Sequence, residues 1–210
     1  MKISIGQITV TPDKAANIAS IGSAVETASK AGASLIVFPE FAMLFNMANL
    51  KASAENLEHH ERTGGGEARI SAMWFEDENL NRRSHFRMGE PLTVVFNVNF
   101  LMEVLNPTLG FNIITDTGVL VSDCRSSYHE INIGMVKGPL ECRIRIESVL
   151  LFPRVYIVEP WVTDTAVLRV FDWVKNAATI AVTSGSAFRG NINASHGITL
   201  IPTTWSIGKV

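Results

Sequence analysis

The sequence contains few cysteines and little net charge, and each shortage excludes a class of protein. Cys124 and Cys142 are the only two cysteines among 210 residues, and no Cys-x-x-Cys pair occurs. A disulfide framework is therefore excluded. The formal net charge is −2 and the pI is about 6.2, and no basic stripe with interleaved aromatic residues is present. We expect no nucleic-acid partner and no anionic membrane surface as a partner.

Long apolar segments are also missing. No apolar run reaches the roughly 18 residues that a membrane-spanning helix needs, and the N-terminus has no apolar core behind a basic start. We therefore expect a cytoplasmic protein in which both cysteines stay reduced. Hydrophobic residues make up 47% of the sequence and charged residues 18%, which is typical of a globular protein. We expect a single domain over residues 1–210, because no repeat, low-complexity run or linker divides the chain.

The first 38 residues alternate between strand and helix patterns. Residues 2–10 and 34–38 are apolar enough to predict two strands, and the segment between them predicts an amphipathic helix that stops at Gly32. The apolar helix face is formed by residues spaced three or four apart: Ile18, Ile21, Val25 and Ala28. A strand, helix and strand within 38 residues form a βαβ unit, so we expect the two strands to be parallel neighbours.

Glu40 follows the second predicted strand, directly after the strand-ending Pro39. Ligands of parallel sheets bind outside the carboxyl ends of the strands, where Glu40 lies. A carboxylate among apolar neighbours is desolvated, which raises its pKa and suits a general base. A solvated carboxylate at the end of a strand is the alternative, and the residues alone leave both interpretations open.

The rest of the chain mixes strand and helix patterns. Residues 92–100 predict a strand, and the turn at Asp116-Thr117-Gly118 predicts a hairpin over 111–121. The helix patterns lie at 48–61, at 71–90 and at 164–176, and the further strand patterns at 147–158, 178–183 and 197–202. His59-His60-Glu61 is interpreted as a solvated face rather than a metal site, because adjacent helix residues point about 100° apart. We expect no metal ion and no cofactor.

Residues 1–46 resemble the opening of the nitrilase, or carbon–nitrogen hydrolase, superfamily. MKISIGQITVTPDKAANIASI is similar to its first strand and helix, and GASLIVFPEF to its second strand with the catalytic glutamate. Further along, the resemblance is looser, at Phe111-Asn112 and again over residues 175–182. It implies an α/β fold, a four-layer α-β-β-α sandwich of two mixed sheets.

The resemblance also implies a chemistry. The superfamily uses a glutamate, a lysine and a cysteine in that chain order: the cysteine attacks the substrate carbon, the glutamate moves protons, and the lysine stabilises the oxyanion. Glu40 matches the glutamate motif, and Cys142 is the nearest candidate nucleophile. Ser126 stands where the lysine belongs, so Lys137 is the candidate for the missing charge. Two flanking arginines, Arg143 and Arg145, would lower the pKa of the Cys142 thiol if they point inward.

Three functions remain open. The first is a hydrolase of non-peptide carbon–nitrogen bonds, which acts on a small amide, N-carbamoyl or nitrile substrate through a cysteine thioester. The second is a catalytically inactive relative that lacks a complete Glu-Lys-Cys triad. The third is an unrelated α/β binding protein. The resemblance further implies a homodimer or larger homo-oligomer, and the mean hydropathy of +0.20 is consistent with apolar surface to cover.

Overall fold

The computed structural model describes residues 2–6, 14–37, 53–54, 56–185 and 197–207. The chain divides into two compact units, Met1–Leu50 and Lys51–Val210.

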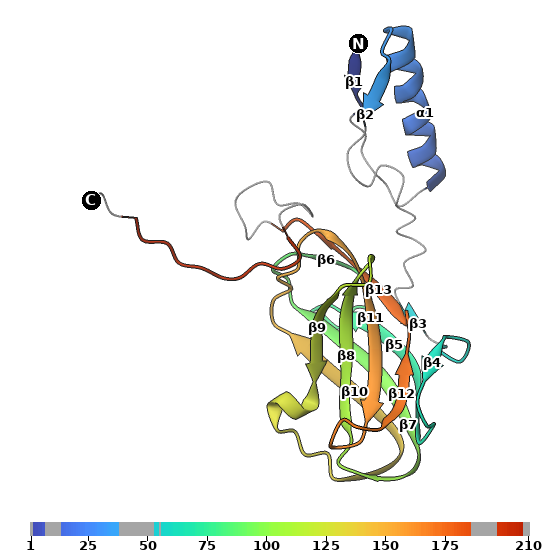
Figure 1. Cartoon of the computed structure of the whole chain (residues 1–210), viewed down its shortest axis with the longest axis vertical. Coiled ribbons are helices and arrows are strands. Elements are labelled where there is room, and N and C mark those ends of the chain that lie inside the picture. The colour runs from blue at the N-terminus through green and yellow to red at the C-terminus, as the bar shows by residue number, and fades with distance from the viewer. Residues whose placement is uncertain (1, 7–13, 38–52, 55, 186–196, 208–210) are drawn as a thin grey trace. The chain divides into compact units, whose positions relative to one another are not determined.

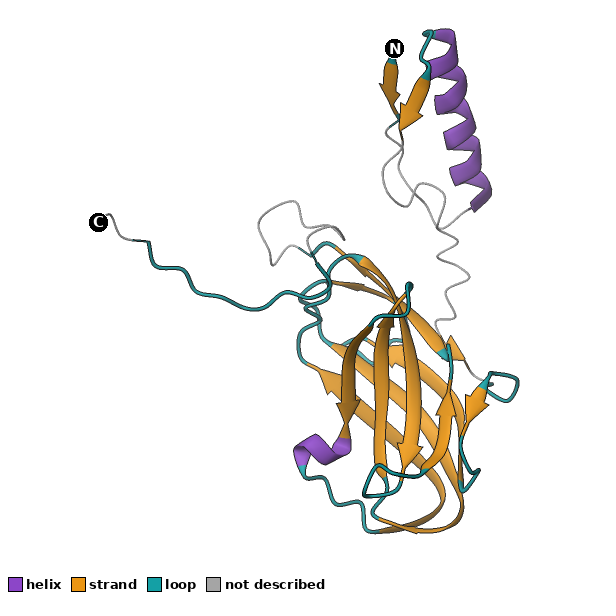
Figure 2. Ribbon diagram, in the orientation of Figure 1, coloured by secondary structure: helices purple, strands orange, loops and turns teal. Residues whose placement is uncertain are grey.

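The first unit contains the predicted βαβ arrangement. Strand β1 (Ile3–Ile5) pairs in parallel with β2 (Leu35–Val37), and helix α1 (Lys14–Lys30) connects them. The prediction of two parallel neighbours is confirmed. The helix ends just before Gly32, whose φ of +76° is the left-handed conformation that a glycine adopts easily after a helix. Figure 2 shows this helix beside its two short strands.

The second unit consists of strands arranged in two sheets (Figure 1). The first sheet has the order β10–β7–β5–β3, and all of its neighbours are antiparallel. Its strands are β3 (Ser53–Ala54), β5 (Ala68–Glu76), β7 (Leu92–Leu105) and β10 (Met135–Ile146).

The second sheet is built around one central strand. Its strands are β4 (Arg62–Thr63), β6 (His85–Arg87), β8 (Thr108–Thr115), β9 (Leu120–Arg125), β11 (Arg154–Thr163), β12 (Val170–Val174) and β13 (Ala178–Thr183). One edge of β11 pairs with β8, which pairs in turn with β9. The other edge of β11 pairs with β12 and then with β13. Asn176, with a φ of +49°, lies between these two strands.

The two sheets enclose one apolar core. Alternate residues of each strand point inward, as a strand with one buried face requires. On β7 the inward residues are Leu92, Val94, Phe96, Val98 and Phe100, and on β8 they are Leu109, Phe111 and Ile113. Each fully buried side chain of this size contributes about 1.5–3 kcal/mol relative to an exposed one. The second unit is therefore a β-sandwich, held together by face-to-face packing of its sheets.

The predicted four-layer α-β-β-α sandwich is wrong. Within the described residues, α1 is the single α-helix, and it belongs to the first unit. The predicted helix pattern at 71–90 is occupied by β5 and β6, and the pattern at 164–176 by a turn and β12. Asp164 makes the turn, because its Oδ1 accepts hydrogen bonds from the backbone N–H groups of Leu168 and Arg169 at 2.8 and 3.1 Å. This side-chain capping competes with helix formation.

Several predicted strands are confirmed. Residues 92–100 lie within β7, the pattern at 178–183 is β13, and the hairpin over 111–121 corresponds to antiparallel β8 and β9. Gly118, with a φ of +85°, occupies the turn between them.

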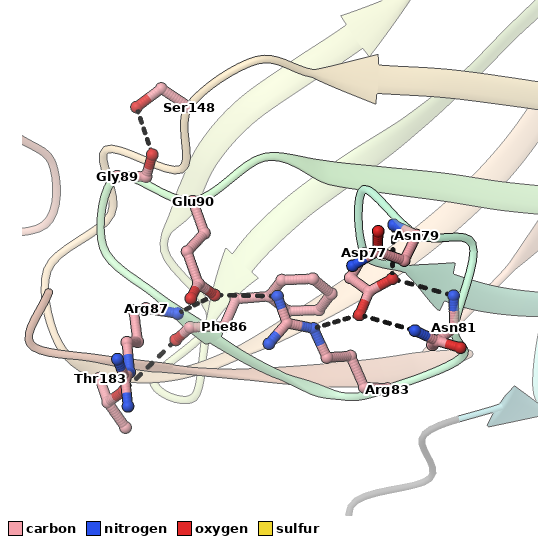
Figure 3. Close-up of polar contacts among 10 residues, drawn as sticks. All are labelled: Asp77, Asn79, Asn81, Arg83, Phe86, Arg87, Gly89, Glu90, Ser148 and Thr183. Carbon is pink, nitrogen blue, oxygen red and sulfur yellow. Dashed lines mark hydrogen bonds and ion pairs between the residues drawn. The ribbon is translucent and has the colours of Figure 1, made fainter.

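A polar cluster fixes the loop between β5 and β7, which carries the edge strand β6 (Figure 3). Asp77 Oδ1 accepts hydrogen bonds from the backbone N–H groups of Asn79 and Asn81, both at 2.9 Å. Arg83 donates to Glu90 Oε2 at 2.9 Å and lies over the ring of Phe86, 4.4 Å from its centroid. The backbone hydrogen bond from Asn81 is the main cause that lowers the pKa of Asp77, so the carboxylate stays charged within this loop.

Candidate binding site on the outer face of the second sheet

The outer face of the second sheet carries two rows of cross-strand neighbours. The first row crosses four strands, and its residues are Arg125, Gly110, Trp161 and Trp173. The second row lies beside it, and its residues are Asp123, Asn112 and Glu159. A hollow of about 200 Å³ lies over these rows, and we call it the outer-face pocket. Its lining residues are Asn112, Asp123, Arg125, Trp161, Thr163, Val167, Val170 and Trp173.

The period-two pattern of the strands places these side chains on one face. On β11, Val158 and Val162 belong to the core, so Glu159 and Trp161 point to the opposite, outer face. On β9, Cys124 packs against the core, and its two neighbours therefore point outward. Because directly opposed residues in an antiparallel pair lie about 4.5–5.5 Å apart, the outward residues of adjacent strands form a continuous surface.

Trp161 lies flat across β8 because glycine stands opposite it. A Cβ atom added to Gly110 would lie 2.4 Å from Trp161 Cζ2 and 2.5 Å from the carbonyl oxygen of Cys124. The indole is 5% exposed, and its Nε1–H donates a hydrogen bond to Asn112 Oδ1 at 3.2 Å. The ring is thus fixed by packing below and by a hydrogen bond at its edge.

Trp173 is held by a buried carboxylate. Its Nε1–H donates to Glu159 Oε2 at 3.0 Å, and Lys175 Nζ donates to the same oxygen at 3.2 Å. The backbone N–H of Asn176 donates to Glu159 Oε1 at 3.1 Å. Three donors therefore compensate the burial of the Glu159 charge. Lys175 Nζ also lies 3.2 Å from the centroid of the Trp173 ring.

Arg125 and Asp123 form an ion pair that still has unused polar atoms. The Arg125 guanidinium stacks between two aromatic rings, with its Cζ 5.0 Å from the centroid of Tyr128 and 5.2 Å from that of Trp161. Arg125 Nε and Asp123 Oδ1 are buried, and neither has a hydrogen-bond partner within the part of the chain that the structure describes. Buried polar atoms are nearly always paired. A donor and an acceptor in this state can be satisfied by a bound hydroxyl group.

A second hollow contains Cys142. It lies between β9 and β10, has a volume of about 430 Å³, and is lined by Leu109, Cys124, Arg125, Ser126, His129, Ile131, Ile133, Leu140, Glu141, Cys142, Arg143, Ile144 and Arg145. Burial raises the pKa of the Cys142 thiol to about 12. The thiol is therefore protonated at neutral pH and is a poor nucleophile.

The condition for activating Cys142, that its flanking arginines point inward, is not met. Residues on β10 alternate between half-buried and exposed, and Arg143 and Arg145 belong to the exposed set. Arg143 pairs with Glu141 and Glu76, and Arg145 Nε lies 2.9 Å from Glu147 Oε2. Their charges are directed to these carboxylates and do not lower the pKa of the thiol.

Of the other two predicted catalytic residues, Lys137 is not brought to Cys142. Lys137 lies on the exposed side of β10, where its Nζ is 3.7 Å from Glu103 Oε1, and it is not among the residues that line the hollow. Glu40 lies outside the described residues.

Sequence reasoning missed the aromatic side chains of the outer-face pocket. The signal is the alternation in Glu159-Pro-Trp161-Val-Thr163, in which polar and aromatic residues occupy every second position. This alternation is typical of a strand with one exposed face. Trp173 was hidden because its segment was interpreted as a helix. Separately, no helix within the described residues combines the length and hydropathy needed to cross a membrane.

A family model and a solved structure both point to the same family of proteins. The sequence model of the Wzt C-terminal domain family matches residues 59–197. The crystal structure of the C-terminal domain of wzt is similar to this chain, with a TM-score of 0.57 and 17% identity over 69% of this chain and 90% of that one. At this identity the similarity shows the fold alone. No curated protein matches.

Two further solved structures are more distant. A Niemann-Pick type C2 protein from the Japanese carpenter ant gives a TM-score of 0.43 and 10% identity, over 59% of this chain and 98% of that one. An immunoglobulin-like protein from Pseudomonas aeruginosa gives a TM-score of 0.29 and 10% identity, over 60% of this chain and 99% of that one. Neither likeness is strong enough to support an argument.

These findings overturn the predicted nitrilase membership and the predicted cysteine hydrolase. The matched family covers most of the sandwich, and it is the Wzt C-terminal domain family rather than a nitrilase family. The resemblance of residues 1–46 to nitrilases rested on a βαβ pattern and the glutamate motif at Glu40, both outside the residues that the family model matches. Through residues 59–197, the chain belongs to the Wzt C-terminal domain family.

Proposed function

We propose that this chain binds a polysaccharide in the outer-face pocket, as the glycan-recognition part of a polysaccharide ABC transporter. The observation that carries the proposal is the pair of fixed indoles, Trp161 and Trp173, beside the unused polar atoms of Asp123 and Arg125. Membership of a family associated with polysaccharide transport supports the same function.

The chemistry of the pocket suits a sugar. A sugar ring presents apolar C–H groups on its faces and hydroxyl groups at its edge. The half-buried indole of Trp173 offers a rigid apolar surface that packs against such a face at low cost in conformational entropy, whereas Trp161, which is 5% exposed, forms the base of the pocket. A hydroxyl donates and accepts one hydrogen bond at a time, so it can serve both Asp123 Oδ1 and Arg125 Nε.

Charge compensation favours a neutral glycan. Arg125 pairs with Asp123, and Lys175 pairs with Glu159 at 3.2 Å. These two pairs therefore leave no excess of positive or negative charge around the two rows. A ligand with a full charge would lose hydration in this pocket without gaining an opposite unpaired charge.

Tryptophan fluorescence tests the proposal. Purified bacterial surface polysaccharides of neutral and acidic composition would be titrated into the full chain and into Trp173→Ala. We expect saturable quenching by a neutral polysaccharide, and a loss of affinity of about tenfold in Trp173→Ala, because an aromatic contact is worth roughly 1.4 kcal/mol.

Trp205→Ala is the matched control, because Trp205 is 80% exposed and does not line the pocket. It should keep the affinity of the unmodified chain. Equal affinity in Trp173→Ala and the unmodified chain would refute the proposed site.

A further inference from the structure

Within the described residues, strand β10 has one backbone edge with which no other strand pairs. It pairs with β7 alone and is therefore the outermost strand of the first sheet. Every residue from Leu140 to Arg145 lines the hollow of about 430 Å³ that contains Cys142. Because consecutive strand residues point to opposite faces, a hollow lined by all of them lies along the backbone edge itself. Such an edge accepts another strand through its unpaired N–H and C=O groups.

The two halves of this edge differ. The N-terminal half contains an irregularity between Val136 and Gly138, followed by Pro139, which has no N–H to donate. Both features oppose the addition of a strand. From Leu140 to Ile146 the pairing with β7 is regular and contains no proline. The C-terminal half is therefore the part of the edge that can accept a strand.

The side chains along the edge form one apolar set and one charged set. The apolar set is half-buried and packs against the core: Leu140, Cys142, Ile144 and Ile146. The charged set is exposed: Lys137, Glu141, Arg143, Arg145 and Glu147. A strand that pairs with this edge has to match both sets, with apolar residues on one face and opposite charges on the other.

The sequence of β10 is complementary to itself when it is inverted about Cys142. In an antiparallel pair of two copies centred on Cys142, residues equally far on either side of it lie opposite each other. Glu141 of one copy then faces Arg143 of the second, and Lys137 faces Glu147. Each of these pairs occurs twice, because the pairing has a two-fold axis. Opposite charges at directly opposed positions stabilise a pair of strands.

A shift of the centre by one residue in either direction loses this match. Centred on Glu141, this carboxylate faces its own copy, and centred on Arg143, two guanidinium groups meet. A centre at Ile144 places Arg143 opposite Arg145. Like charges at directly opposed positions are destabilising. The charges therefore select the register centred on Cys142.

We propose that β10 pairs antiparallel with β10 of a second copy of this chain, in the register centred on Cys142. The pairing joins the first sheets of the two copies into one continuous sheet. On the inner face it places Leu140 of each copy against Ile144 of the other, so that apolar side chains cover one another. The proposal is independent of the proposed polysaccharide function.

Cysteine cross-linking tests the register. Directly opposed residues of an antiparallel pair have Cα atoms about 4.5–5.5 Å apart, within the range of a disulfide. The full chain with Cys124→Ala keeps Cys142 as its one thiol and would be oxidised with copper phenanthroline in air. Two Cys142 thiols lose two protons and two electrons to the oxidant. We expect a covalent dimer that dithiothreitol separates again, and its absence would overturn the proposal.

Leu140→Cys, made together with Cys124→Ala and Cys142→Ala, is the matched control. Residue 140 stands opposite Ile144 and not opposite its own copy, so this variant should give no covalent dimer. Adding Ile144→Cys should restore the cross-link. A covalent dimer that forms as readily through residue 140 alone as through Cys142 would overturn the register.

Charge reversal tests the interface without oxidation. Lys137→Glu places a carboxylate opposite Glu147 at both ends of the pair, so the dissociation constant of the dimer should rise about tenfold. Lys137→Glu combined with Glu147→Lys reverses both partners and should restore the constant of the unmodified chain. Both side chains are more than half exposed, so neither change should disturb folding, which circular dichroism checks.

Sedimentation equilibrium at micromolar concentration gives the mass and the dissociation constant. A monomeric mass for the unmodified chain would overturn the proposal. A dimer whose dissociation constant is the same in Lys137→Glu and in the unmodified chain would also overturn it, because another surface would then hold the two copies together.

Discussion

At the scale of single residues, Gly110 is the position on which the geometry of the outer-face pocket depends most. It lets the indole of Trp161 lie across β8, and its missing side chain also leaves room for the backbone of β9. No other residue leaves this space, because any Cβ would lie within 2.5 Å of the Cys124 carbonyl oxygen.

Gly110→Ala should therefore damage both stability and binding. Overpacking of this kind costs about 1–3 kcal/mol, and the displaced indole should weaken glycan binding. Chemical denaturation and fluorescence titration measure the two effects. Gly22→Ala serves as the control, because nothing lies within 4 Å of the added Cβ; unchanged stability in Gly110→Ala would show that Trp161 does not need this space.

The residue scale also shows why the predicted catalytic site failed. Cys142 was singled out as a nucleophile with arginines beside it, but sequence alone does not show which way a strand residue points. Arg143 and Arg145 are adjacent to it in sequence and lie on the opposite side of the strand, where carboxylates pair with them. Adjacency along a strand separates side chains instead of bringing them together.

At the scale of elements, a buried ion cluster joins the two sheets. Asp172 on β12 has a fully buried side chain and accepts a hydrogen bond from the backbone N–H of Ile70 on β5 at 2.7 Å. Arg62 and Arg69 lie 3.0 and 3.4 Å from its two oxygens. This carboxylate therefore connects β12 with β5 and with the segment that carries β4.

Asp172→Ala should destabilise the sandwich by about 3 kcal/mol. The change leaves the backbone N–H of Ile70 and the largely buried Arg62 without their hydrogen-bond acceptor. Urea denaturation measures the loss. Asp116→Ala is the matched control, because Asp116 is exposed and its pair with Arg154 is long, at 3.9 Å. Similar losses in the two variants would contradict the structural role of the cluster.

The same carboxylate makes stability depend on pH. Burial is the main cause that raises the pKa of Asp172 above its ordinary value of 3.8. The folded state therefore binds more protons than the unfolded state between 3.8 and the raised native pKa, so the contribution of this group falls as pH rises through that window. Denaturation of the unmodified chain and of Asp172→Asn at several pH values isolates the effect. An opposite slope in their difference would contradict the burial argument.

The elements that sequence predicted correctly are those with a strong local signal. The hairpin of β8 and β9 has a glycine turn, and β13 is a short apolar run, so local pattern decides both. The segment 164–176 has apolar residues at helical spacing, yet Asp164 turns the chain and Asp172 is bound to β5. The strand at 170–174 therefore depends on a contact with a residue about a hundred positions away in the sequence, and a local sequence pattern does not reveal such a contact.

At the scale of the whole molecule, all residues of the proposed pocket belong to the second compact unit. The predicted homo-oligomer and the predicted cytoplasmic location stay predictions. The family match, over residues 59–197, also lies within that unit. The sequence interpretation gave too much weight to residues 1–46, whose βαβ pattern is real but belongs to the other unit.

A chain of residues 51–210 should therefore bind the same polysaccharide with the affinity of the full chain. Calorimetric titration of both proteins compares the dissociation constants. A loss of more than tenfold in the shorter protein, with its near-ultraviolet circular dichroism unchanged, would show that residues 1–50 contribute to the site.

The most direct test of the central claim uses the indole N–H signals of the four tryptophans in nuclear magnetic resonance spectra. Each tryptophan gives one signal, and a bound polysaccharide should shift those of Trp161 and Trp173. The signals of Trp74 and Trp205 should not shift. Trp74 is buried and its Nε1–H donates a hydrogen bond to Glu76 Oε1 at 2.6 Å, and Trp205 is exposed and does not line the pocket. A polysaccharide that binds while the signals of Trp161 and Trp173 remain unchanged would contradict the proposed site.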